Sequence, residues 1–410
     1  MSEVAGAAML RDPRQPDEDM NFDIAIVGAG PAGLCFARSL AGSGLTVAVV
    51  ERQPLAAIAE PAFDGREIAL THASRAILER LGLWARLDPA EVSELRDARV
   101  VDGDREDGLR ISAADGRRPQ LGWLVPNHLI RREAHALVAA QPQLQLLAGQ
   151  GVRAVERGGD GAVLTLDDGT RLRARLVVAA DSRFSQVRRM CGIGAHSRDH
   201  GKHMLVCRMA LERPHRHVAW EWFDYGQTMA LLPVNGDVAS VVLTLPPQEM
   251  ARLEAMDAAA FEADVRRRYR GRFGAMRLLS TRHVYPLVSV LAERFVAPRL
   301  ALVGDAAVGM HPVTAHGFNL GLQGQATLAR EVLAAHRGGR DIGAEAVLGG
   351  YQRRHRIAAL PMYAATRLVL RVFTDDRDAM RGVRGAILRL SDRLPPFRRA
   401  VAARLTQAPR

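Results

Sequence analysis

The chain has 410 residues, of which 48% are hydrophobic and 25% charged, the composition of a globular protein with material for one large or two closely packed domains. Its net charge of +11 is due almost wholly to arginine, since Lys202 is the single lysine, and only 5% of the residues are aromatic, so a nucleic-acid-binding protein is disfavoured. No apolar run reaches the roughly 18 residues of a membrane-spanning helix. The cysteines, Cys35, Cys191 and Cys207, are too far apart for a metal motif, so no metal site is expected.

Residues 1–20 form a polar segment that we expect to be a disordered tail, because prolines and acidic residues dominate its second half. The segment lacks the basic start and the long apolar stretch of a secretory signal. Since the cysteines are expected to be reduced core thiols, a cytoplasmic location is predicted.

A strand–helix–strand unit follows this tail. Residues 22–30 (FDIAIVGAG) are an apolar run that breaks into glycines, residues 31–44 are typical of a helix closed by glycine, and residues 45–52 are a second apolar strand. Two strands joined by a helix in so short a segment indicate a parallel sheet.

Further elements follow from periodicity along the rest of the chain. The pattern predicts helices over 72–87 and 127–141, strands over 144–180 and 200–246, a helical stretch over 247–270, a strand over 300–307 (LALVGDAA) and helices from Leu320 onward.

These patterns predict an α/β protein with two interleaved domains and a helical C-terminus. The expected ranges are 21–90, 120–195 and 280–330 for a Rossmann-like, dinucleotide-binding domain, 91–119 and 196–279 for a β-rich substrate domain, and 331–410 for C-terminal helices.

The glycines of the first motif have distinct expected roles. Gly28 and Gly30 allow a tight turn and bring backbone N–H groups close to a pyrophosphate, and Gly33 lets the helix pack on the strand. Glu51 ends the second strand, where a carboxylate can accept a hydrogen bond from a ribose hydroxyl. The motif stands between a predicted strand and a predicted helix, so a bound dinucleotide is favoured over a glycine-rich turn without a ligand.

A second polar motif lies far along the chain. Gly304 and Asp305 follow a predicted strand, and residues 311–319 (HPVTAHGFN) precede the next helix. The aspartate can accept a hydrogen bond from a sugar-like hydroxyl, and a helix start offers N–H groups to an anion or a carbonyl. One cofactor held at both ends would account for both motifs.

The two motifs together, GAGPAG and ER near the start with GDAA, HP and HGFNLGL near the end, resemble the class A FAD-dependent aromatic monooxygenases. Within that family they are most similar to the ubiquinone-biosynthesis hydroxylases of the demethoxyubiquinol hydroxylase type. The resemblance runs from Phe22 to about Arg371. It implies a p-hydroxybenzoate-hydroxylase-like fold, FAD as cofactor, and NADH or NADPH with O2 as co-substrates.

Carried over by position, the resemblance also implies a set of FAD contacts. These are Gly28, Gly30, Pro31, Ala32 and Gly33 at the pyrophosphate, Glu51 at the adenosine ribose, Arg52 and Arg131 near the ribityl phosphate, Val152 near the adenine, Gly304 and Asp305 at the ribityl chain, and Pro312, Gly317, Phe318 and Asn319 beside the isoalloxazine ring. Asp181 begins the motif that links flavin and nicotinamide binding in this family, and Arg66 faces either flavin or substrate.

The implied activity is that of an FAD-dependent NAD(P)H monooxygenase. It would hydroxylate a small aromatic or prenylated quinol in ubiquinone biosynthesis through a flavin C4a-hydroperoxide. His316 stands where glutamine is usual and is the candidate for proton transfer, because histidine titrates near neutrality; capping or packing is the alternative. The chain also departs from the family pattern at Ser182, where glycine is commonest, and at Gly324, where aspartate is frequent.

Alternatives remain at this stage. A phenol of secondary metabolism would require the same motifs, and a flavin-dependent prenyl-lipid reductase would differ in consuming no oxygen. A flavin-dependent halogenase is disfavoured, since Trp220-Glu221-Trp222 is followed by Phe-Asp and not by the rest of its motif. Alternation puts Trp220 and Trp222 on one face of a strand, which predicts either the roof of a substrate pocket or core packing.

The C-terminal segment 380–394 (MRGVRGAILRLSDRL) carries apolar residues beside arginines. Its Val383, Ile387, Leu388 and Leu390 could form an apolar stripe, so contact with the inner membrane surface or with a protein of the ubiquinone pathway is one interpretation. A helix packed on the rest of the protein is the other.

Overall fold

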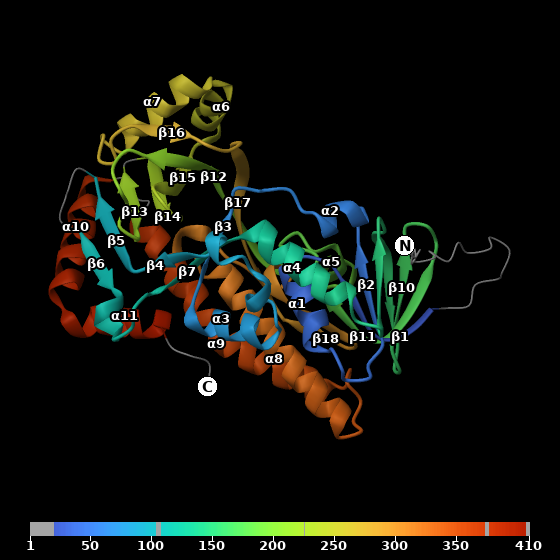
Figure 1. Ribbon diagram of the computed structural model, residues 1–410. Coiled ribbons are helices and arrows are strands. Elements are labelled where there is room, and N and C mark those ends of the chain that lie inside the picture. The colour runs from blue at the N-terminus through green and yellow to red at the C-terminus, as the bar shows by residue number, and fades with distance from the viewer. Residues whose placement is uncertain (1–19, 104–107, 225, 374–376, 407–410) are drawn as a thin grey trace.

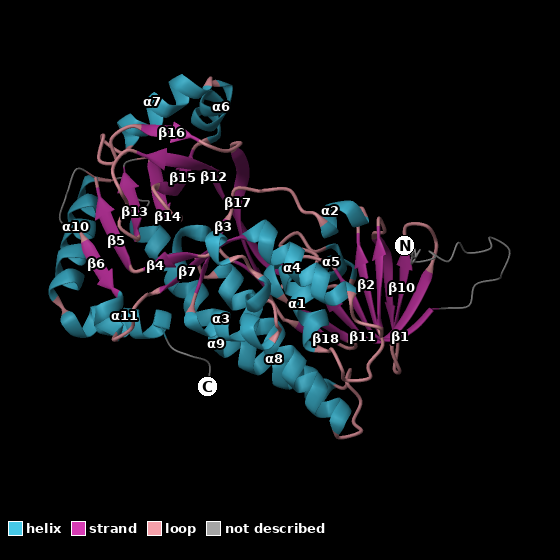
Figure 2. Cartoon of the chain, in the orientation of Figure 1, coloured by secondary structure: helices cyan, strands magenta, loops and turns pink. Residues whose placement is uncertain are grey.

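The computed structural model describes residues 20–103, 108–224, 226–373 and 377–406 (Figure 1). The predicted tail lies outside these residues except for Met20, which begins the first strand. The chain forms two large sheets, each covered by helices, with a small three-stranded sheet between them (Figure 2).

The first large sheet is the predicted dinucleotide-binding sheet. Its strands are, in spatial order, β18 (Val296–Ala297), β19 (Leu300–Leu302), β11 (Arg171–Ala179), β1 (Met20–Val27), β2 (Val47–Glu51) and β8 (Leu144–Ala148), with β10 (Ala162–Leu166) and β9 (Val152–Arg157) attached to β11. Strands β19, β11, β1, β2 and β8 run parallel. Their apolar runs are buried because helices cover the sheet, as parallel sheets require.

The second large sheet is mostly antiparallel. Its order is β20 (Val308–Gly309), β17 (His283–Ala292), β12 (Ala195–Leu211), β15 (Val238–Leu245), β14 (Gln227–Pro233), β13 (Val218–Asp224), β5 (Asp97–Asp102) and β6 (Leu109–Ser112), with β16 (Met276–Leu278) beside β12. A small sheet of β3 (Glu67–Leu70), β7 (Gly122–Pro126) and β4 (Ser93–Leu95) adjoins it.

Three apolar clusters hold the helices against the sheets. The helices are α1 (Pro31–Ser39), α2 (Leu55–Ala59), α3 (His72–Arg80), α4 (Asn127–Ala139), α5 (Gln186–Met190), α6 (Pro247–Ala255), α7 (Ala258–Arg268), α8 (Gly317–Arg337), α9 (Glu345–Phe373), α10 (Asp378–Arg393) and α11 (Pro395–Thr406). One cluster joins α1, α4, α8 and α9 to the parallel sheet, a second joins α6 and α7 to the antiparallel sheet, and a third joins α10 and α11 to β5 and β6. None of the helices in the described residues combines the length and apolarity needed to cross a bilayer.

Two sequence expectations differ from the structure in detail. The helical stretch expected over 247–270 is two helices, because Asp257 accepts a hydrogen bond from the Ala260 N–H and so starts α7 anew. Strand β17, expected within the dinucleotide-binding part (280–330), instead pairs with β12 in the antiparallel sheet. Pairing partners so far apart in the chain are chosen by tertiary packing, which periodicity does not report.

Candidate active site

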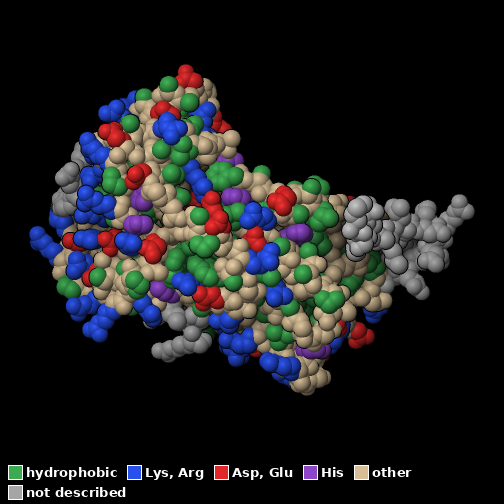
Figure 3. Space-filling view, in the orientation of Figure 1, with side chains coloured by type: hydrophobic (Ala, Val, Ile, Leu, Met, Phe, Trp, Pro, Cys, Tyr) green, Lys and Arg blue, Asp and Glu red, His purple; other side chains and the backbone are tan. Residues whose placement is uncertain are grey.

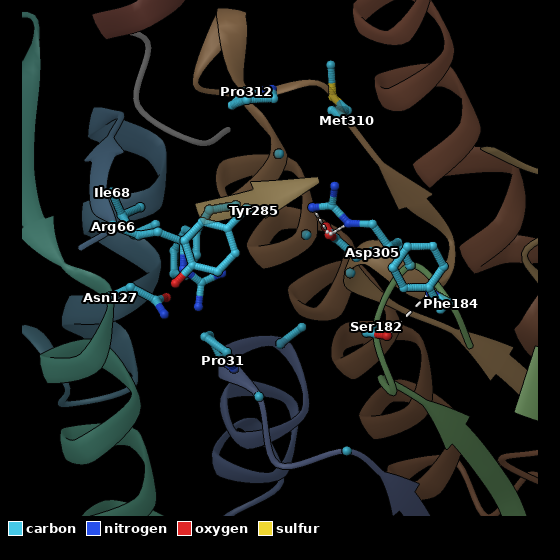
Figure 4. Close-up of a pocket in the computed structure, with 18 of the residues that line it drawn as sticks. Pro31, Arg66, Ile68, Asn127, Ser182, Phe184, Tyr285, Asp305, Met310 and Pro312 are labelled. Carbon is cyan, nitrogen blue, oxygen red and sulfur yellow. Dashed lines mark hydrogen bonds and ion pairs between the residues drawn. The ribbon is translucent and has the colours of Figure 1, made fainter. Parts of the chain in front are cut away.

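A cavity of about 1210 Å³ lies where the two large sheets meet. Residues of both sequence motifs line it, among them Gly30, Glu51, Asp181, Asp305 and Gly317. Figure 4 shows Pro31 of the first motif and Asp305 and Pro312 of the second around this cavity. Of the other predicted FAD contacts, Gly28, Pro31, Ala32, Arg52, Arg66, Arg131, Val152, Gly304, Pro312 and Phe318 also line it. Segments separated by most of the chain thus share one cavity.

The glycine loop after β1 forms one end of this cavity. Gly28 has a φ of +109°, and a Cβ there would lie 2.5 Å from the carbonyl oxygen of Ala180. A Cβ on Gly33 would lie 2.0 Å from the Gly28 oxygen, so this glycine permits close helix–strand packing and does not line the cavity. A Cβ on Gly30 would meet no protein atom within 4 Å and would fill the cavity itself. Gly30 caps α1 without a side-chain hydrogen bond, so the helix N-terminus is open to an anion.

The carboxylate of Glu51 is positioned by backbone donors at the end of β2. One oxygen accepts from the Ala29 N–H at 2.7 Å and the other from the Gln53 N–H at 2.9 Å. Because the side chain is tied to the glycine loop itself, its position relative to that loop is defined before any ligand binds.

Asp305 connects the second motif to Arg183. Its Oδ2 accepts hydrogen bonds from Nε of Arg183 at 3.1 Å and from Nη2 at 2.8 Å, and Arg183 also donates to the Val288 carbonyl. Among the described residues none donates to Asp305 Oδ1, which remains available to a hydroxyl group.

Asp181 has a structural role in addition to its place on the cavity wall. It accepts hydrogen bonds from the Ser185 hydroxyl at 2.5 Å and from the Val187 N–H at 3.1 Å, and so closes the start of α5. The next residue, Ser182, has a φ of +82°, the left-handed region in which glycine costs least. This conformation accounts for the glycine that is commonest at this position in the family.

A polar cluster at the middle of the cavity joins three separate segments. Asp64 accepts from Arg66 at 2.5 Å and from the Asn127 amide at 2.7 Å, and Tyr285 donates its hydroxyl proton to the Asp64 carbonyl at 2.7 Å. The guanidinium of Arg66 stands 5.5 Å from the centre of the Tyr285 ring (Figure 4). The sequence predicted a site role for Arg66 but for neither Tyr285 nor Asn127.

The start of α8 forms the wall opposite the glycine loop. Gly317 and Phe318 line the cavity, and the helix begins without a side-chain cap, so its N–H groups are free to face a ligand. Asn319 lies behind the wall, where it accepts from the Thr71 N–H at 3.0 Å and donates to the Ala69 carbonyl at 2.7 Å. It therefore positions the helix and does not line the cavity.

His316 is not brought into the cavity. Its imidazole Nδ1 is hydrogen-bonded to the Thr314 carbonyl, and the side chain lines a separate groove together with residues such as Arg80 and Met362. The predicted role in proton transfer at the flavin has no support from this position. The sequence could not show this, since which way a residue at a helix start points depends on the turn before it.

A second histidine, His311, does line the cavity. Burial lowers the pKa of His311 to about 3, with the neighbouring imidazole of His200 adding to the effect, so the ring is neutral near pH 7. The two ring centres are 4.8 Å apart, and His200 is hydrogen-bonded to the Ser289 hydroxyl at 2.9 Å.

The antiparallel sheet forms a wall of the cavity on which apolar residues alternate with polar ones. Its lining residues are Met204, Val206, Glu221, Thr228, Ala230, Leu232, Ser240, Val242, Thr244, Tyr285, Pro286 and Leu287. Trp220 and Trp222 point to the other face and are buried in the core beneath α6 and α7. The interpretation of these tryptophans as a roof over the pocket is therefore wrong, and core packing is correct. Glu221, between them, is the residue that faces the cavity.

These features fit FAD. The open space at Gly30 with an uncapped helix start suits a pyrophosphate, and the carboxylates of Glu51 and Asp305 suit the hydroxyls of a ribose and a ribityl chain. One cavity of about 1210 Å³ contains both of these ends and also a face of the antiparallel sheet, where a second, aromatic molecule can lie.

Comparison with known proteins agrees with this geometry. Residues 21–362 match the family model described as FAD binding domain. The chain is 42% identical to ubiquinone hydroxylase UbiM of Neisseria meningitidis, over 94% of this chain and 85% of that protein. It is 37% identical to ubiquinone hydroxylase UbiL of Rhodospirillum rubrum, over 93% and 88%. It is 29% identical to the 3-demethoxyubiquinol 3-hydroxylase of Escherichia coli, over 92% and 96%.

Solved structures show the same fold. That of p-nitrophenol 4-monooxygenase PnpA from Pseudomonas putida has a TM-score of 0.76 at 19% identity, over 94% of this chain and 97% of that one. PqsL of Pseudomonas aeruginosa in complex with 2-aminobenzoylacetate has a TM-score of 0.73 at 24% identity, over 88% and 99%. At these identities the likeness concerns the fold alone.

Proposed function

The chain belongs to the FAD binding domain family, and from this premise we propose that it is an FAD-dependent monooxygenase that hydroxylates the aromatic ring of a ubiquinone precursor. The observation that carries the proposal is the single cavity that joins the glycine loop and Asp305 at one side to an apolar sheet face at the other. A flavin and an aromatic ring can therefore lie next to each other within one cavity.

The chain's own contribution is binding, orientation and exclusion of water. When bound, FAD supplies hydride acceptance and oxygen activation. The Gly30 loop and the α1 N-terminus would hold the pyrophosphate, Glu51 the ribose, and Asp305 the ribityl hydroxyls. The positive end of the α8 dipole would stabilise negative charge on the flavin ring system. The apolar sheet face keeps water from the reacting ring, which oxygen transfer requires.

NADH or NADPH is the proposed electron donor, and a prenylated phenol or quinol the proposed substrate. The apolar residues of β12, β14 and β15 on the cavity wall suit a ring with an isoprenoid substituent better than a charged metabolite.

The test uses the purified flavoprotein with NADH or NADPH, ¹⁸O₂ and a phenol that carries one isoprene unit. We expect one ¹⁸O atom in the ring for each NAD(P)H oxidised in the coupled reaction. Oxidation of NAD(P)H without oxygen consumption, with a reduced double bond in the product, would instead identify a prenyl-lipid reductase.

A second arm separates the ubiquinone pathway from specialised metabolism. Cells that lack this protein should accumulate a quinone precursor with one ring oxygen too few. An unchanged quinone pool, with a missing phenolic product elsewhere, would assign the enzyme to the hydroxylation of a different phenol.

We also propose that α10 contacts a membrane surface. Leu388 packs inward at 4% exposure, whereas Val383, Ile387 and Leu390 are 44%, 39% and 61% exposed and fall on one helical face. Leu394, which is 44% exposed, follows directly after the helix. Arg389 and Arg393 are exposed beside them, at the edge of the molecule where basic side chains gather (Figure 3). An apolar stripe flanked by arginines suits an anionic bilayer, where a prenylated substrate resides.

Flotation with anionic and neutral liposomes tests this contact. The double variant Ile387→Ser with Leu390→Ser should lose anionic-liposome binding, while Leu55→Ser, which changes an exposed leucine on α2, should retain it. Equal flotation of both variants would refute the membrane contact. The apolar stripe of α10 would then be assigned to a contact with another protein.

A further inference from the structure

One row of residues crosses the apolar wall of the cavity. Glu221 on β13 is paired with Ala230 on β14, Ala230 with Val242 on β15, and Val242 with Val206 on β12. All four side chains line the cavity, and the neighbour of Glu221 on the other side is Val100 of β5. A carboxyl group thus stands at the end of an otherwise apolar row.

Within the described residues, this carboxyl group lacks the arginine partner that several buried acids have. Glu67 is paired with Arg208 at 2.7 Å, Asp264 with Arg268 at 2.5 Å, and Asp102 with Arg384 at 3.1 Å. In the described part of the chain, no side chain or backbone group hydrogen bonds or ion-pairs with the carboxyl of Glu221. Glu221 is half-buried and its exposed part faces the cavity. An acid that is largely removed from water without a partner is costly to folding, so its presence on a ligand cavity indicates a function.

Burial raises the pKa of Glu221 to about 8. Two ion pairs lie on the same side of the sheet as Glu221: Asp102 with Arg384 beside β13, and Glu67 with Arg208 further along the wall. Tyr269 and Cys207 lie behind the sheet. The other ionisable groups of this region are on the cavity lining, namely Arg66, Tyr285 and His311. Since the arginines Arg384, Arg208 and Arg66 are already paired with Asp102, Glu67 and Asp64, none of them supplies Glu221 with a counter-charge.

The other ionisable groups near the apolar wall are engaged elsewhere. Tyr285 donates its hydroxyl to the Asp64 carbonyl, and Arg66 is paired with the Asp64 carboxylate. His311 accepts a hydrogen bond at Nδ1 from the Val313 N–H. Among the described residues, Glu221 is therefore the ionisable group on this wall whose oxygen atoms are available to a substrate.

We propose that Glu221 binds the ring hydroxyl of the substrate and accepts its proton during hydroxylation, an inference that rests on the proposed function. The O–H bond of the substrate breaks, an O–H bond forms on the Glu221 carboxylate, and the electron pair stays on the ring oxygen. That charge is shared with the ortho and para carbons, which makes them better nucleophiles towards the oxygen that the cofactor delivers. The attacked carbon then loses its hydrogen as a proton, which offsets the negative charge left where the delivered oxygen departed, and the proton held by Glu221 returns to the ring oxygen.

A base of this kind is most effective when its pKa lies close to the working pH. A carboxyl group with an ordinary pKa would be too weak a base to take a phenolic proton. The apolar row of Ala230, Val242 and Val206 thus has a chemical consequence, because desolvation is the cause of the higher pKa.

The test is the pH dependence of kcat/KM between pH 6 and 10, measured with the flavin-loaded enzyme and a phenol that carries one isoprene unit. The wild type should show a rise that levels near pH 8. Glu221→Gln should be about 100-fold slower at pH 8 and lose that rise, since general-base catalysis commonly contributes this much. Glu221→Asp should retain the rise, and Glu254→Gln, an exposed change in the same part of the fold, should match the wild type.

Flavin content and melting temperature of each variant establish that the protein is folded and loaded. The proposal is overturned if Glu221→Gln keeps the pH-dependent rise, whatever its rate, or stays within threefold of the wild type. A wild type that makes no hydroxylated product from any prenylated phenol would refute the proposed function instead, so the two failures are distinguishable.

Discussion

The guanidinium of Arg183 lies 2.8 Å from the carboxylate of Asp305, although 122 residues separate them in the chain. Arg183 follows the β11 strand end and Asp305 follows the β19 strand end, and these two strands are neighbours in the parallel sheet. The ion pair is only partly exposed, so it is screened less than a surface pair. It orients Asp305 towards the cavity before a cofactor arrives.

Replacement of Asp305 should weaken FAD binding. In Asp305→Ala the enzyme loses a charged acceptor for a ribityl hydroxyl, and about 1.5–3 kcal/mol is typical of such a hydrogen bond, which corresponds to roughly a tenfold to hundredfold higher Kd. Fluorescence titration of the apoprotein with FAD measures this. The control is Asp341→Ala, which removes an equally close pair with Arg299 away from the cavity and should leave FAD affinity unchanged. Equal affinity in both variants would contradict the assignment of Asp305.

The glycines of the first motif should separate into a ligand type and a packing type. Gly30→Val places a side chain into open cavity space, so the apoprotein should keep its free energy of unfolding within about 0.5 kcal/mol and bind no FAD. Gly33→Ala puts a Cβ against the Gly28 oxygen and should cost about 1–3 kcal/mol of stability even without ligand. Urea denaturation and flavin absorbance distinguish the two. Gly159→Val, at an open position outside the cavity, serves as control.

Stability should depend on pH through Glu221. Burial raises the folded-state pKa of this group from 4.5 to about 8, so the folded state holds a proton that the unfolded chain releases at lower pH. The free energy of unfolding therefore falls as pH rises from about 4.5 to about 8, by no more than about 5 kcal/mol. Glutamine does not titrate, so the free energy of unfolding of Glu221→Gln does not fall in this way. The variant should be more stable than the wild type at pH 9 but similar to it at pH 4.5.

Urea denaturation of both proteins at pH 4.5, 7 and 9 measures that difference, in which the contributions of other titrating groups cancel. A difference between wild type and Glu221→Gln that stays constant over this range would show that Glu221 keeps an ordinary pKa in the fold.

Gly324 and His355 should be coupled. A Cβ at Gly324 on α8 would lie 2.6 Å from the His355 ring, which is held in place by the Tyr351 and Phe295 rings. Burial lowers the pKa of His355 to about 4, so the ring packs as a neutral group. The histidine thus takes the space that the aspartate frequent at this position would need.

We therefore expect Gly324→Ala to cost about 1–3 kcal/mol of stability. In the double variant with His355→Ala, the loss of stability should be smaller than the sum of the losses in the two single variants, because the smaller side chain makes room for the new Cβ. Thermal denaturation of the four proteins completes the cycle. Strict additivity would mean that the two residues do not compete for space.

The sequence by itself determined the fold class and the two motifs that line the cavity. Short apolar runs that break into glycines mark strand ends at Gly28 and at Gly304, and such local signals need no knowledge of the rest of the chain. The same locality predicted Glu51 and Asp305 as carboxylates at strand ends, and both lie on the cavity.

Only the tertiary structure decided which side chains face the reaction space. Alternation along β13 puts Trp220 and Trp222 on one face and Glu221 on the other, but it does not say which face the helices α6 and α7 will cover. The turn before α8 likewise directs His316 away from the cavity. The pattern within an element is set by its own residues, whereas its orientation is set by the apolar surface of elements far away in the chain, which bury one face and leave the other to the ligand.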